Sequence, residues 1–449
     1  MSLRLYNTLS RESEELQPVR KGKVNLYTCG PTVYNFAHIG NLRSYIFADT
    51  LYRTLKLNGY KTRWVMNITD VDDKTIRQAI AKYGEKACPK ELKKFTDFYT
   101  REFMKDLDAI NVSRKDIKFV KVSDSIPEIK KFIKKLIKLG YAYKANDGVY
   151  FSIAKYQKDF RDYGELVGKG FLKGKKVGAR VKVDEYEKEN MSDFALWKAR
   201  DKEDGNIFWK DKDLGDGRPG WHIECSTINY EAFKGTTDIH TGGVDLIFPH
   251  HVNEIAQSQP LYRPFTKIWC HPEHLMVEGE KMSKSKGNLY TLSDLREKGF
   301  EPLALRYLML GAGYKTKLNF TWESLEGAGK RLSDLWNRYS AVKKSKSAGE
   351  DMGPFLDVLN NNLDTPRALS LLGKKVSFLK ELGLLPKKLP SLGRKTEGNL
   401  PPEVTELLGQ REAARRNKQF MQADTLRDRI FELGYVIEDG ADGPGLKHR

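Results

Sequence analysis

The sequence predicts an α/β fold, in which a Rossmann-type nucleotide-binding domain is split by an insertion and followed by an all-α C-terminal region. Residues 23–29 are typical of a buried strand, which Gly30 and Pro31 break. Residues 36–57 have the pattern of a helix, and residues 62–68 have that of the next strand. Strand, helix and strand in this order form a βαβ unit, with room for a nucleotide after the first strand.

The 449 residues are enough for two to four domains, each with its own core. In the second half of the nucleotide-binding domain, residues 221–229 and 249–257 favour helices and residues 237–240 favour a strand. From Pro302 onward the pattern is helical. The expected domains are the nucleotide-binding domain at 1–111 and 216–301, a connective insertion at 112–215, a helical region at 302–342, a helical bundle at 354–385 and a C-terminal domain at 403–449.

The insertion begins with a predicted helix. Ser125 and Glu128 have the spacing of a capping box, and Gly140 ends the apolar periodicity that follows. We interpret the lysines of this helix as a solvated face. Residues 148–153 then favour a strand.

The chain is strongly basic, with 78 Lys and Arg against 60 Asp and Glu and a net charge of +18. The excess is concentrated in residues 111–190 and 310–400, away from the nucleotide-binding motifs. A positive field of this kind attracts nucleic acid. Charge that serves only solubility is the simpler alternative.

Neither secretion nor a membrane span is expected. Residues 1–11 are polar and lack the apolar segment of a signal peptide, and no apolar run approaches about 18 residues. Four cysteines in 449 residues do not make a disulfide framework. We therefore expect a cytoplasmic, reduced protein whose thiolates are available for a metal.

Two motifs of the nucleotide-binding domain suit phosphate chemistry. Residues 281–285 read Lys-Met-Ser-Lys-Ser, and two lysines separated by small residues are able to close over a triphosphate. A solvated basic loop is the alternative. In the first half of the domain, His38 lies at a helix start, where phosphate binds well, and Gly40 lets a nucleotide approach the backbone.

The motif His-Ile-Gly-Asn at 38–41, together with residues 281–285, resembles the paired signature of class I aminoacyl-tRNA synthetases. Four more segments are similar to the cysteinyl-tRNA synthetases, and the similarity runs nearly from end to end. These segments are Tyr-Thr-Cys-Gly-Pro-Thr-Val-Tyr at 27–34, Asn-Ile-Thr-Asp-Val-Asp-Asp-Lys at 67–74, Gly-Trp-His-Ile-Glu-Cys-Ser at 220–226 and Phe-Pro-His-His-Val-Asn-Glu at 248–254.

The resemblance implies that ATP activates L-cysteine to cysteinyl-adenylate and that the cysteinyl group then passes to the 3′ end of tRNA(Cys). Residues 302–342 would contact the tRNA stem and residues 403–449 the anticodon end, in a protein expected to be a monomer. Mg²⁺ is expected with ATP. The residues expected to stabilise phosphates are His38, Asn41, Lys281 and Lys284, and the further ATP contacts are Gly40, Asp245 (at the ribose) and Ser283.

Asn41 departs from the family, whose first signature ends in a second histidine. An asparagine amide donates a hydrogen bond to phosphate, but it carries no positive charge. Losing one such donor costs on the order of 1–3 kcal/mol of transition-state stabilisation. Arg43, two residues later, is a candidate to supply the missing charge.

The resemblance also implies one zinc site, made by Cys29, Cys225, His250 and Glu254. His250 and Glu254 are spaced i and i+4, so they share one helix face, and zinc accepts this mixed set of ligands. His251, at i and i+3 from Glu254, is an alternative ligand. His222 and Glu224 are candidates for a supporting pair behind the ligands. In the family, the metal keeps an open position for the substrate thiolate, which selects cysteine over serine or alanine.

The expected contacts of the amino-acid substrate are Cys29, Gly30, Thr69, Trp221 and His240, with core packing as the alternative for Thr69 and Trp221. Two rival functions remain open. One is a ligase that passes the same adenylate to a small amine, and the other is a non-catalytic RNA-binding paralogue. The basic helical residues 310–449 argue against the first rival, and the intact motif at 281–285 argues against the second.

Overall fold

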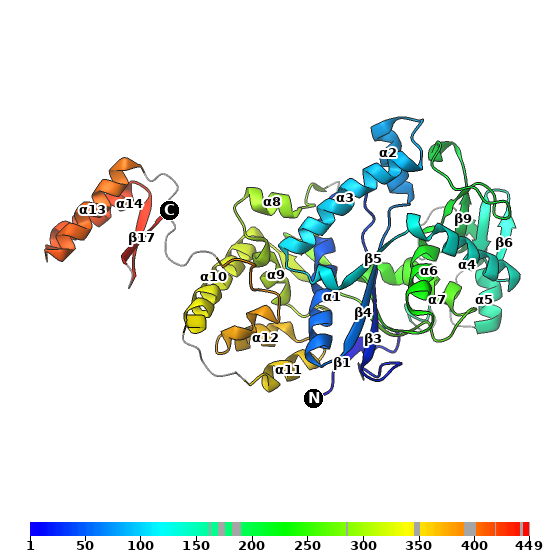
Figure 1. The fold of residues 1–449 in the computed structure, drawn as a ribbon, viewed down its shortest axis with the longest axis horizontal. Coiled ribbons are helices and arrows are strands. Elements are labelled where there is room, and N and C mark those ends of the chain that lie inside the picture. The colour runs from blue at the N-terminus through cyan, green and yellow to red at the C-terminus, as the bar shows by residue number, and fades with distance from the viewer. Residues whose placement is uncertain are drawn as a thin grey trace. The chain divides into compact units, whose positions relative to one another are not determined.

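A computed structural model shows a chain that forms two compact units (Figure 1). The first unit comprises Met1–Leu335 and Lys346–Leu385, and the second comprises Trp336–Ser345 and Pro386–Arg449. The residues that the structure describes are 1–160, 163–168, 176–181, 190–283, 286–344, 351–389, 401–417, 419–440 and 443–448.

A five-stranded parallel sheet forms the centre of the first unit, in the order β12-β11-β3-β4-β5. Its strands are β3 (Lys23–Thr28), β4 (Lys61–Ile68), β5 (Ile117–Lys121), β11 (Thr237–Thr241) and β12 (Thr266–Cys270). β3 lies between β4, from the first half of the split domain, and β11, from the second half. The boundary between β3 and β11 is therefore the switch point at whose carboxyl edge α/β sheets bind ligands.

Helices cover both sides of this sheet, with α1 on one side and α6 and α7 on the other, while α2 and α3 connect β4 to β5 (Figure 1). The bounds are α1 (Ile39–Leu57), α2 (Asp73–Tyr83), α3 (Pro89–Ala109), α6 (Trp221–Phe233) and α7 (Val252–Ser258). The predicted Rossmann-type βαβ unit is thus confirmed. Its first helix begins slightly later than predicted, directly after its N-cap residue His38.

The insertion carries its own sheet, in the order β10-β9-β7-β6 with β8 paired to β9. Its elements are α4 (Ile126–Lys138), β6 (Ala142–Ala145), β7 (Gly148–Phe151), α5 (Ile153–Phe160), β8 (Lys176–Val181), β9 (Asn190–Ala199) and β10 (Gly217–Pro219). The predicted capping box of α4 is wrong, because a 3₁₀ turn leads directly into the helix. Ser125 Oγ donates to the Lys121 carbonyl at 3.1 Å and caps no amide.

The region after the parallel sheet is mainly helical, but a small sheet in the order β14-β13-β15 interrupts it. β15 falls within the region that was expected to be helical. The segment is a strand there because it pairs in parallel with β13, with Leu318 opposite Leu275. The elements are β13 (Leu275–Val277), β14 (Glu280–Lys281), α8 (Leu292–Glu297), α9 (Pro302–Leu310), β15 (Leu318–Phe320), α10 (Trp322–Lys344), α11 (Gly353–Asn360) and α12 (Thr365–Leu372). An N-terminal hairpin, β1 (Arg4–Asn7) and β2 (Glu12–Glu15), completes the first unit.

The second unit is built on the helix pair α13 (Pro402–Arg416) and α14 (Phe420–Glu432), which pack through Val404, Leu407 and Ile430. An antiparallel hairpin that the sequence did not predict follows them, β16 (Tyr435–Gly440) and β17 (Gly443–His448). In the part of the chain that the structure describes, the C-terminal region is therefore helical except for β15 and this last hairpin. Within the described ranges, no helix is both long and apolar enough to cross a membrane.

A buried ion pair joins α1 to α9. The side chains of Asp49 and Arg306 are fully buried, and Arg306 Nη2 donates to Asp49 Oδ2. Arg53 Nε donates to the same oxygen at 2.6 Å, and the backbone N–H of Ser113 donates to Asp49 Oδ1 at 2.7 Å. Burial alone would raise the pKa of Asp49, but Arg306 and Arg53 beside it hold that pKa below its ordinary value.

We expect Asp49→Ala to lower the free energy of unfolding by about 3–5 kcal/mol, because it leaves the Arg306 guanidinium buried without its counter-ion. Chemical denaturation at neutral pH measures this loss. Since the folded-state pKa is lowered, the pair stabilises the protein above about pH 4 and loses its effect as pH falls through the folded pKa. The control is the double variant Asp49→Leu with Arg306→Met, which removes both charges and should recover most of the loss. Equal losses in the single and double variants would contradict this account.

Candidate active site

The split domain brings residues more than 200 positions apart together at the carboxyl edge of the sheet. β3 and β11 pair with His240 opposite Tyr27 and Thr241 opposite Thr28. The backbone N–H of Cys29 donates to the Thr241 carbonyl at 2.9 Å, so the pairing continues past the end of β3. Cys29 Sγ consequently lies 3.5 Å from His240 Nε2.

The four predicted metal ligands form one buried cluster. Cys29 Sγ lies 4.0 Å from Cys225 Sγ and 3.7 Å from Glu254 Oε1. His250 Nε2 lies 3.4 Å from Cys225 Sγ and 3.1 Å from Glu254 Oε1. Cys225 comes from α6 and Glu254 from α7, whereas His250 lies in a π-helical turn, Ile247–His251, that precedes α7. The predicted helix over this segment is therefore divided, but His250 and Glu254 still meet.

A second set of donors adjoins the first and shares Cys29 and Glu254 with it. His251 Nε2 lies 3.3 Å from Cys29 Sγ and 3.8 Å from Glu254 Oε1. His240 Nε2 lies 3.5 Å from the same sulfur and 3.7 Å from the same carboxylate oxygen. Either set of four brings its donor atoms within 4.8 Å of one another. The alternative ligand His251 thus belongs to the second set and His250 to the first.

The ionisable groups of the cluster carry too little positive charge to balance their acidic members. Burial and the neighbouring Cys225 thiol raise the pKa of Cys29 well above its ordinary value, and the same two causes raise the pKa of Glu254 to about 8. Burial opposes a charge on Cys225 too, but the Cys29 thiol and His250, which bond to it, lower its pKa. Burial lowers the pKa of His240 and of His251, so both rings are neutral. Burial opposes a charge on His250, but Cys225 and Glu254 raise its pKa to about 10. One imidazolium balances only one of the three acidic groups, so ionisation of Cys29, Cys225 and Glu254 together requires further positive charge.

The donor set fits a tetrahedral divalent ion. Zinc bonds of about 2.0 to 2.3 Å at tetrahedral angles place neighbouring donor atoms about 3.3 to 3.8 Å apart. The four distances around Cys29, Cys225, His250 and Glu254 run from 3.1 to 4.0 Å. A divalent cation would also favour the thiolate and carboxylate forms that burial disfavours.

Further side chains hold these donors in place. His222 Nδ1 lies 3.0 Å from His250 Nδ1, and Trp221 stacks on the His250 ring with centroids 4.3 Å apart. The sequence did not single out His271, whose Nε2 lies 2.8 Å from His251 Nδ1. Its position directly after β12, at the same sheet edge, was the available signal. Partners of this kind fix the orientation of metal-binding histidines.

Gly30 and Thr69 lie where β3 and β4 end. The backbone N–H of Gly30 donates to Asn67 Oδ1 at 2.8 Å, and a Cβ added at Gly30 would lie 1.7 Å from the Asn67 carbonyl oxygen. Only glycine allows this approach. Asn67 Nδ2 donates to Thr69 Oγ1 at 3.0 Å, and Thr69 Oγ1 lies 3.5 Å from Glu224 Oε2. Glu224, which the sequence made a candidate for support behind the ligands together with His222, accepts this hydrogen bond from Thr69.

Asn41 forms a reciprocal cap at the start of α1. Its backbone N–H donates to His38 Nδ1 at 3.2 Å, and its Oδ1 accepts from the His38 backbone N–H at 3.3 Å. Burial lowers the pKa of His38, although Asp245 nearby raises it in part. The neutral ring therefore accepts at Nδ1 and keeps a proton at Nε2 for donation.

The two signature motifs are in contact. The backbone N–H of Ile39 donates to the Tyr290 carbonyl at 2.8 Å, and a Cβ added at Gly40 would meet Met282 Sδ at 2.9 Å. The loop itself is held by Ser283, whose backbone N–H donates to Asn288 Oδ1 at 2.8 Å. Lys281 is exposed at its start. Lys284 and Ser285 lie outside the described residues.

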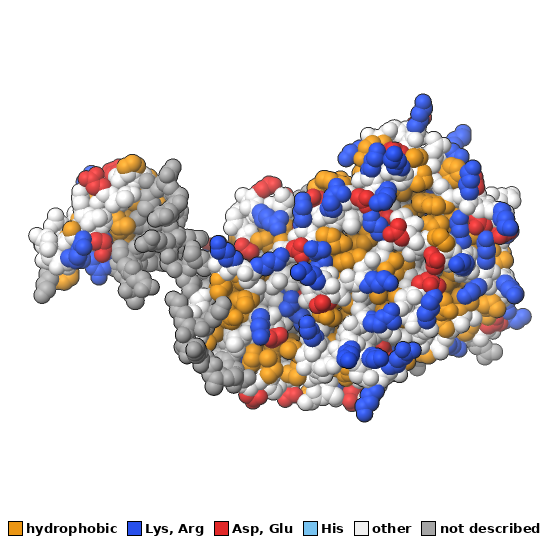
Figure 2. All heavy atoms as spheres, viewed as in Figure 1, with side chains coloured by type: hydrophobic (Ala, Val, Ile, Leu, Met, Phe, Trp, Pro, Cys, Tyr) orange, Lys and Arg blue, Asp and Glu red, His pale blue; other side chains and the backbone are white. Residues whose placement is uncertain are grey.

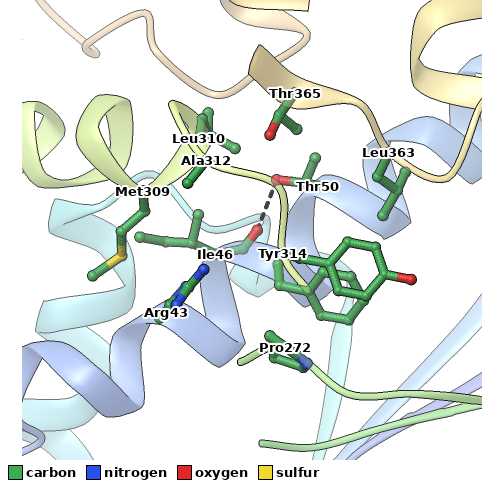
Figure 3. A pocket seen from close by; sticks show the side chains of 11 residues that line it. Arg43, Ile46, Thr50, Pro272, Met309, Leu310, Ala312, Tyr314, Leu363 and Thr365 are labelled. Atoms are coloured by element: carbon green, nitrogen blue, oxygen red, sulfur yellow. Dashed lines mark hydrogen bonds between the residues drawn. The ribbon is translucent and has the colours of Figure 1, made fainter. Parts of the chain in front are cut away.

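Arg43 does not face the phosphate side of α1, which corrects the role expected for it. Its Nη1 donates to the carbonyl oxygens of Glu273 and His274 at 2.9 and 2.6 Å, and its Nη2 donates to that of Thr316. Figure 3 shows the side chain lining a small pocket with Met309 and other side chains from α1 and α9. Arg43 is thus a structural residue that satisfies buried carbonyls.

The fold and the paired motifs are those of a class I aminoacyl-tRNA synthetase. Residues 15–330 match the family of class I (C) tRNA synthetase catalytic domains, and residues 397–443 match the cysteinyl-tRNA ligase anticodon-binding domain. The chain belongs to the cysteinyl-tRNA ligase family.

Relatives of known name cover the chain from end to end. The cysteine–tRNA ligase of Chlamydia felis is 42% identical over 99% of this chain and 98% of its own, and that of Leptospira interrogans is 38% identical over the same shares. That of Methanosarcina mazei is 39% identical over 99% of each chain. Among solved structures, methionyl-tRNA synthetase of Mycobacterium tuberculosis bound by methionyl-adenylate has a TM-score of 0.59 at 13% identity, over 82% of this chain and 83% of that one. This last likeness shows the shared fold.

Arg43→Ala and Asn41→Ala should differ in their effects on stability. Arg43→Ala leaves buried carbonyls without donors, so we expect a loss of about 2–4 kcal/mol in the free energy of unfolding, with the KM for ATP unchanged in the folded protein. Asn41→Ala removes half of a cap and should cost about 1 kcal/mol of stability. Denaturation and ATP-dependent kinetics on both variants separate the two effects. A KM for ATP that rises in Arg43→Ala would contradict the structural role.

Proposed function

We propose that the sheet edge and the start of α1 form one active site that activates L-cysteine with ATP and transfers the cysteinyl group to tRNA(Cys). The observation that carries this proposal is the juxtaposition of a buried two-sulfur donor cluster with paired nucleotide motifs that contact each other. Membership of an aminoacyl-tRNA ligase family implies three substrates, which are ATP, an amino acid and tRNA. The protein acts as a monomer in the cytoplasm, where thiols stay reduced.

The nucleotide lies across the start of α1. His38 donates from Nε2 to phosphate, and the positive end of the α1 helix dipole adds favourable potential there. The Asn41 side chain keeps this turn in place through the reciprocal cap and offers its NH₂ group to a phosphate oxygen. Gly40 and Ser283 admit the nucleotide, and Asp245 binds the ribose hydroxyls.

Lys281 and Lys284 supply the positive charge that Asn41 lacks. Contact between Gly40 and Met282 ties the lysine loop to the helix start, so movement of the loop brings its charges toward the phosphates. Positioning and electrostatic stabilisation are sufficient for adenylate formation, and no protein nucleophile is needed. Mg²⁺ accompanies the ATP phosphates.

Cys29, Cys225, His250 and Glu254 hold one zinc ion. Support for this set over the one with His240 and His251 comes from charge, since it offers two thiolates in place of one to a buried divalent cation. When bound, the ion prefers a soft thiolate to a hydroxyl, which distinguishes cysteine from serine. His240 and His251 then line the remaining side of the cluster.

The body of the amino acid lies between Gly30, Thr69 and Trp221. Gly30 leaves room that any side chain would fill, and Thr69 is oriented by Asn67 and Glu224. Trp221, stacked on the ligand His250, closes the site beside the metal. His240 faces the aminoacyl group.

Cysteine-dependent exchange of pyrophosphate into ATP tests the proposal, measured with and without tRNA. Exchange with cysteine, together with charging of tRNA(Cys), is the expected result. Exchange without charging would favour the ligase that uses a small amine acceptor. An absence of exchange would favour the non-catalytic paralogue and contradict the proposal.

Cys225→Ser should lower zinc content and raise the KM for cysteine by at least tenfold, because a neutral hydroxyl is a poor zinc ligand. The KM for ATP should be unchanged, since the nucleotide lies at α1. Metal analysis and exchange kinetics measure these effects. Cys270→Ser is a matched control, because Cys270 is also buried at the end of β12 but belongs to neither donor set. Full zinc content with parental cysteine affinity in Cys225→Ser would remove the metal from substrate selection.

Removal of residues 401–449 should leave cysteine-dependent exchange largely intact and lower kcat/KM for tRNA(Cys) by about tenfold or more. The adenylation motifs all lie in the first unit, whereas α13 and α14 fall in the match to the anticodon-binding domain. Charging kinetics of the truncated chain provide the measurement. Parental charging would show that the second unit does not contribute to tRNA binding.

A further inference from the structure

Exposed aromatic rings gather on α2, α3 and the loop before α1. Phe36, Tyr83 and Phe98 are 47%, 39% and 38% exposed. Phe36 packs edge-on against Phe98 and Tyr99, with ring centroids 6.1 and 5.3 Å apart, and Phe98 packs edge-on against Tyr99 at 5.1 Å. These four rings, here called the aromatic platform, leave much of their surface in water, where large apolar side chains usually mark a binding surface.

Positive charge without an ion-pair partner accompanies the platform on α2, α3 and the loop between them. Lys82 Nζ lies 5.6 Å from the ring centre of Tyr83 and 5.7 Å from that of Phe98. Lys82, Arg77, Lys86 and Lys90 are exposed, and none of them forms an ion pair with another described residue. Over α2 and α3, Figure 2 shows hydrophobic side chains among many Lys and Arg side chains. Aromatic faces beside free cations suit a polyanion with planar bases.

The platform begins at the entrance of the active site. Phe36 precedes His38 by two residues, so their Cα atoms are at most about 7 Å apart. His38 caps α1, where the adenylate forms. Anything that stacks on Phe36 and Phe98 therefore lies within a few nucleotide lengths of the reacting carboxyl group.

We propose that the aromatic platform stacks an unpaired base of the 3′ end of the tRNA and so guides the terminal ribose into the site. The inference rests on the proposed function, because it requires that the 3′ end of an RNA reach the start of α1. Stacking holds single-stranded bases independently of their sequence, and the exposed lysines attract the phosphates between them.

Single-stranded nucleotides fit better than the other candidate occupants. A base within a duplex has its faces covered by its neighbours and offers no surface to a ring. The adenine of ATP already has a position at Gly40 and the 281–285 loop, on the other side of His38 along the chain. A protein partner with an apolar face would gain nothing from Lys82 beside the rings or from the other exposed cations of this region.

The test compares binding of intact tRNA(Cys) with binding of the same tRNA lacking its unpaired 3′ nucleotides. For the parent protein, removal of these nucleotides should weaken binding by about 5- to 150-fold, the effect of one stacked base or a little more. Phe98→Ala should weaken binding of intact tRNA by a similar factor and leave the shortened tRNA unaffected. Phe98→Trp should restore binding, because a larger ring stacks at least as well. Leu139→Ala, which removes an apolar side chain of the insertion that is at least as exposed as Phe98, is the matched control and should bind both RNAs as the parent does.

Three results would overturn the proposal. Equal losses for intact and shortened tRNA in Phe98→Ala would place the rings against another part of the RNA. A higher KM for ATP in that variant would assign the platform to adenine. Parental binding, with a lowered midpoint of thermal unfolding, would make the platform a stabilising contact of the loop. Because binding is measured without catalysis, these results are distinct from a failure of cysteine-dependent exchange, which would count against the proposed function.

Discussion

The parallel pairing of β3 with β11 is the constraint on which the site depends. These strands come from the two halves of a domain that the insertion separates, and their backbone bonds place Cys29 beside His240. In the same second half, α6 precedes β11 and α7 follows it, and these helices bring Cys225 and Glu254 to the same edge. If the register between the strands moved by one residue, Cys29 would point away from the cluster. The metal donors are thus assembled by sheet topology, and no short loop could hold all four.

Burial makes this donor set unfavourable on its own. Several groups compete for few protons in a space that excludes water, and isolated charges there cost several kcal/mol each. The raised pKa values of Cys29 and Glu254 express that cost. This cost is present where the donor side chains converge, and neutral histidines and stacked rings support these side chains. Such an arrangement is typical of a site built for a cation, because ion binding turns the unfavourable groupings into ligands. Among the described residues, the adjoining start of α1 has no such crowding of acidic groups: His38 is neutral there, and Asn41 caps the helix.

The sequence predicted the parts of the fold that depend on local periodicity. β3, α1 and β4 are found within a few residues of their expected bounds. Each has a clear apolar pattern, β3 ends before Gly30, and Gly59 separates α1 from β4. β15 and the hairpin of β16 and β17 were missed because their pairings are not visible in a short window. The four candidate metal ligands, which motif spacing and resemblance named, lie together in the structure. Arg43 was assigned wrongly, because the direction of a residue on α1 depends on how the helix is rotated against the segment 273–316, which no local pattern reveals. His271 was missed for a similar reason, since only the order of strands in the sheet brings it beside His251.

The central claim is that the buried cluster binds a metal that takes the substrate sulfur as a further ligand. X-ray absorption at the zinc edge, on the purified full chain before and after addition of L-cysteine, tests this most directly. The account predicts two sulfur neighbours at about 2.3 Å in the free protein and three with cysteine, and no change with L-serine. A sulfur count that stays at two when the protein is saturated with cysteine would contradict it.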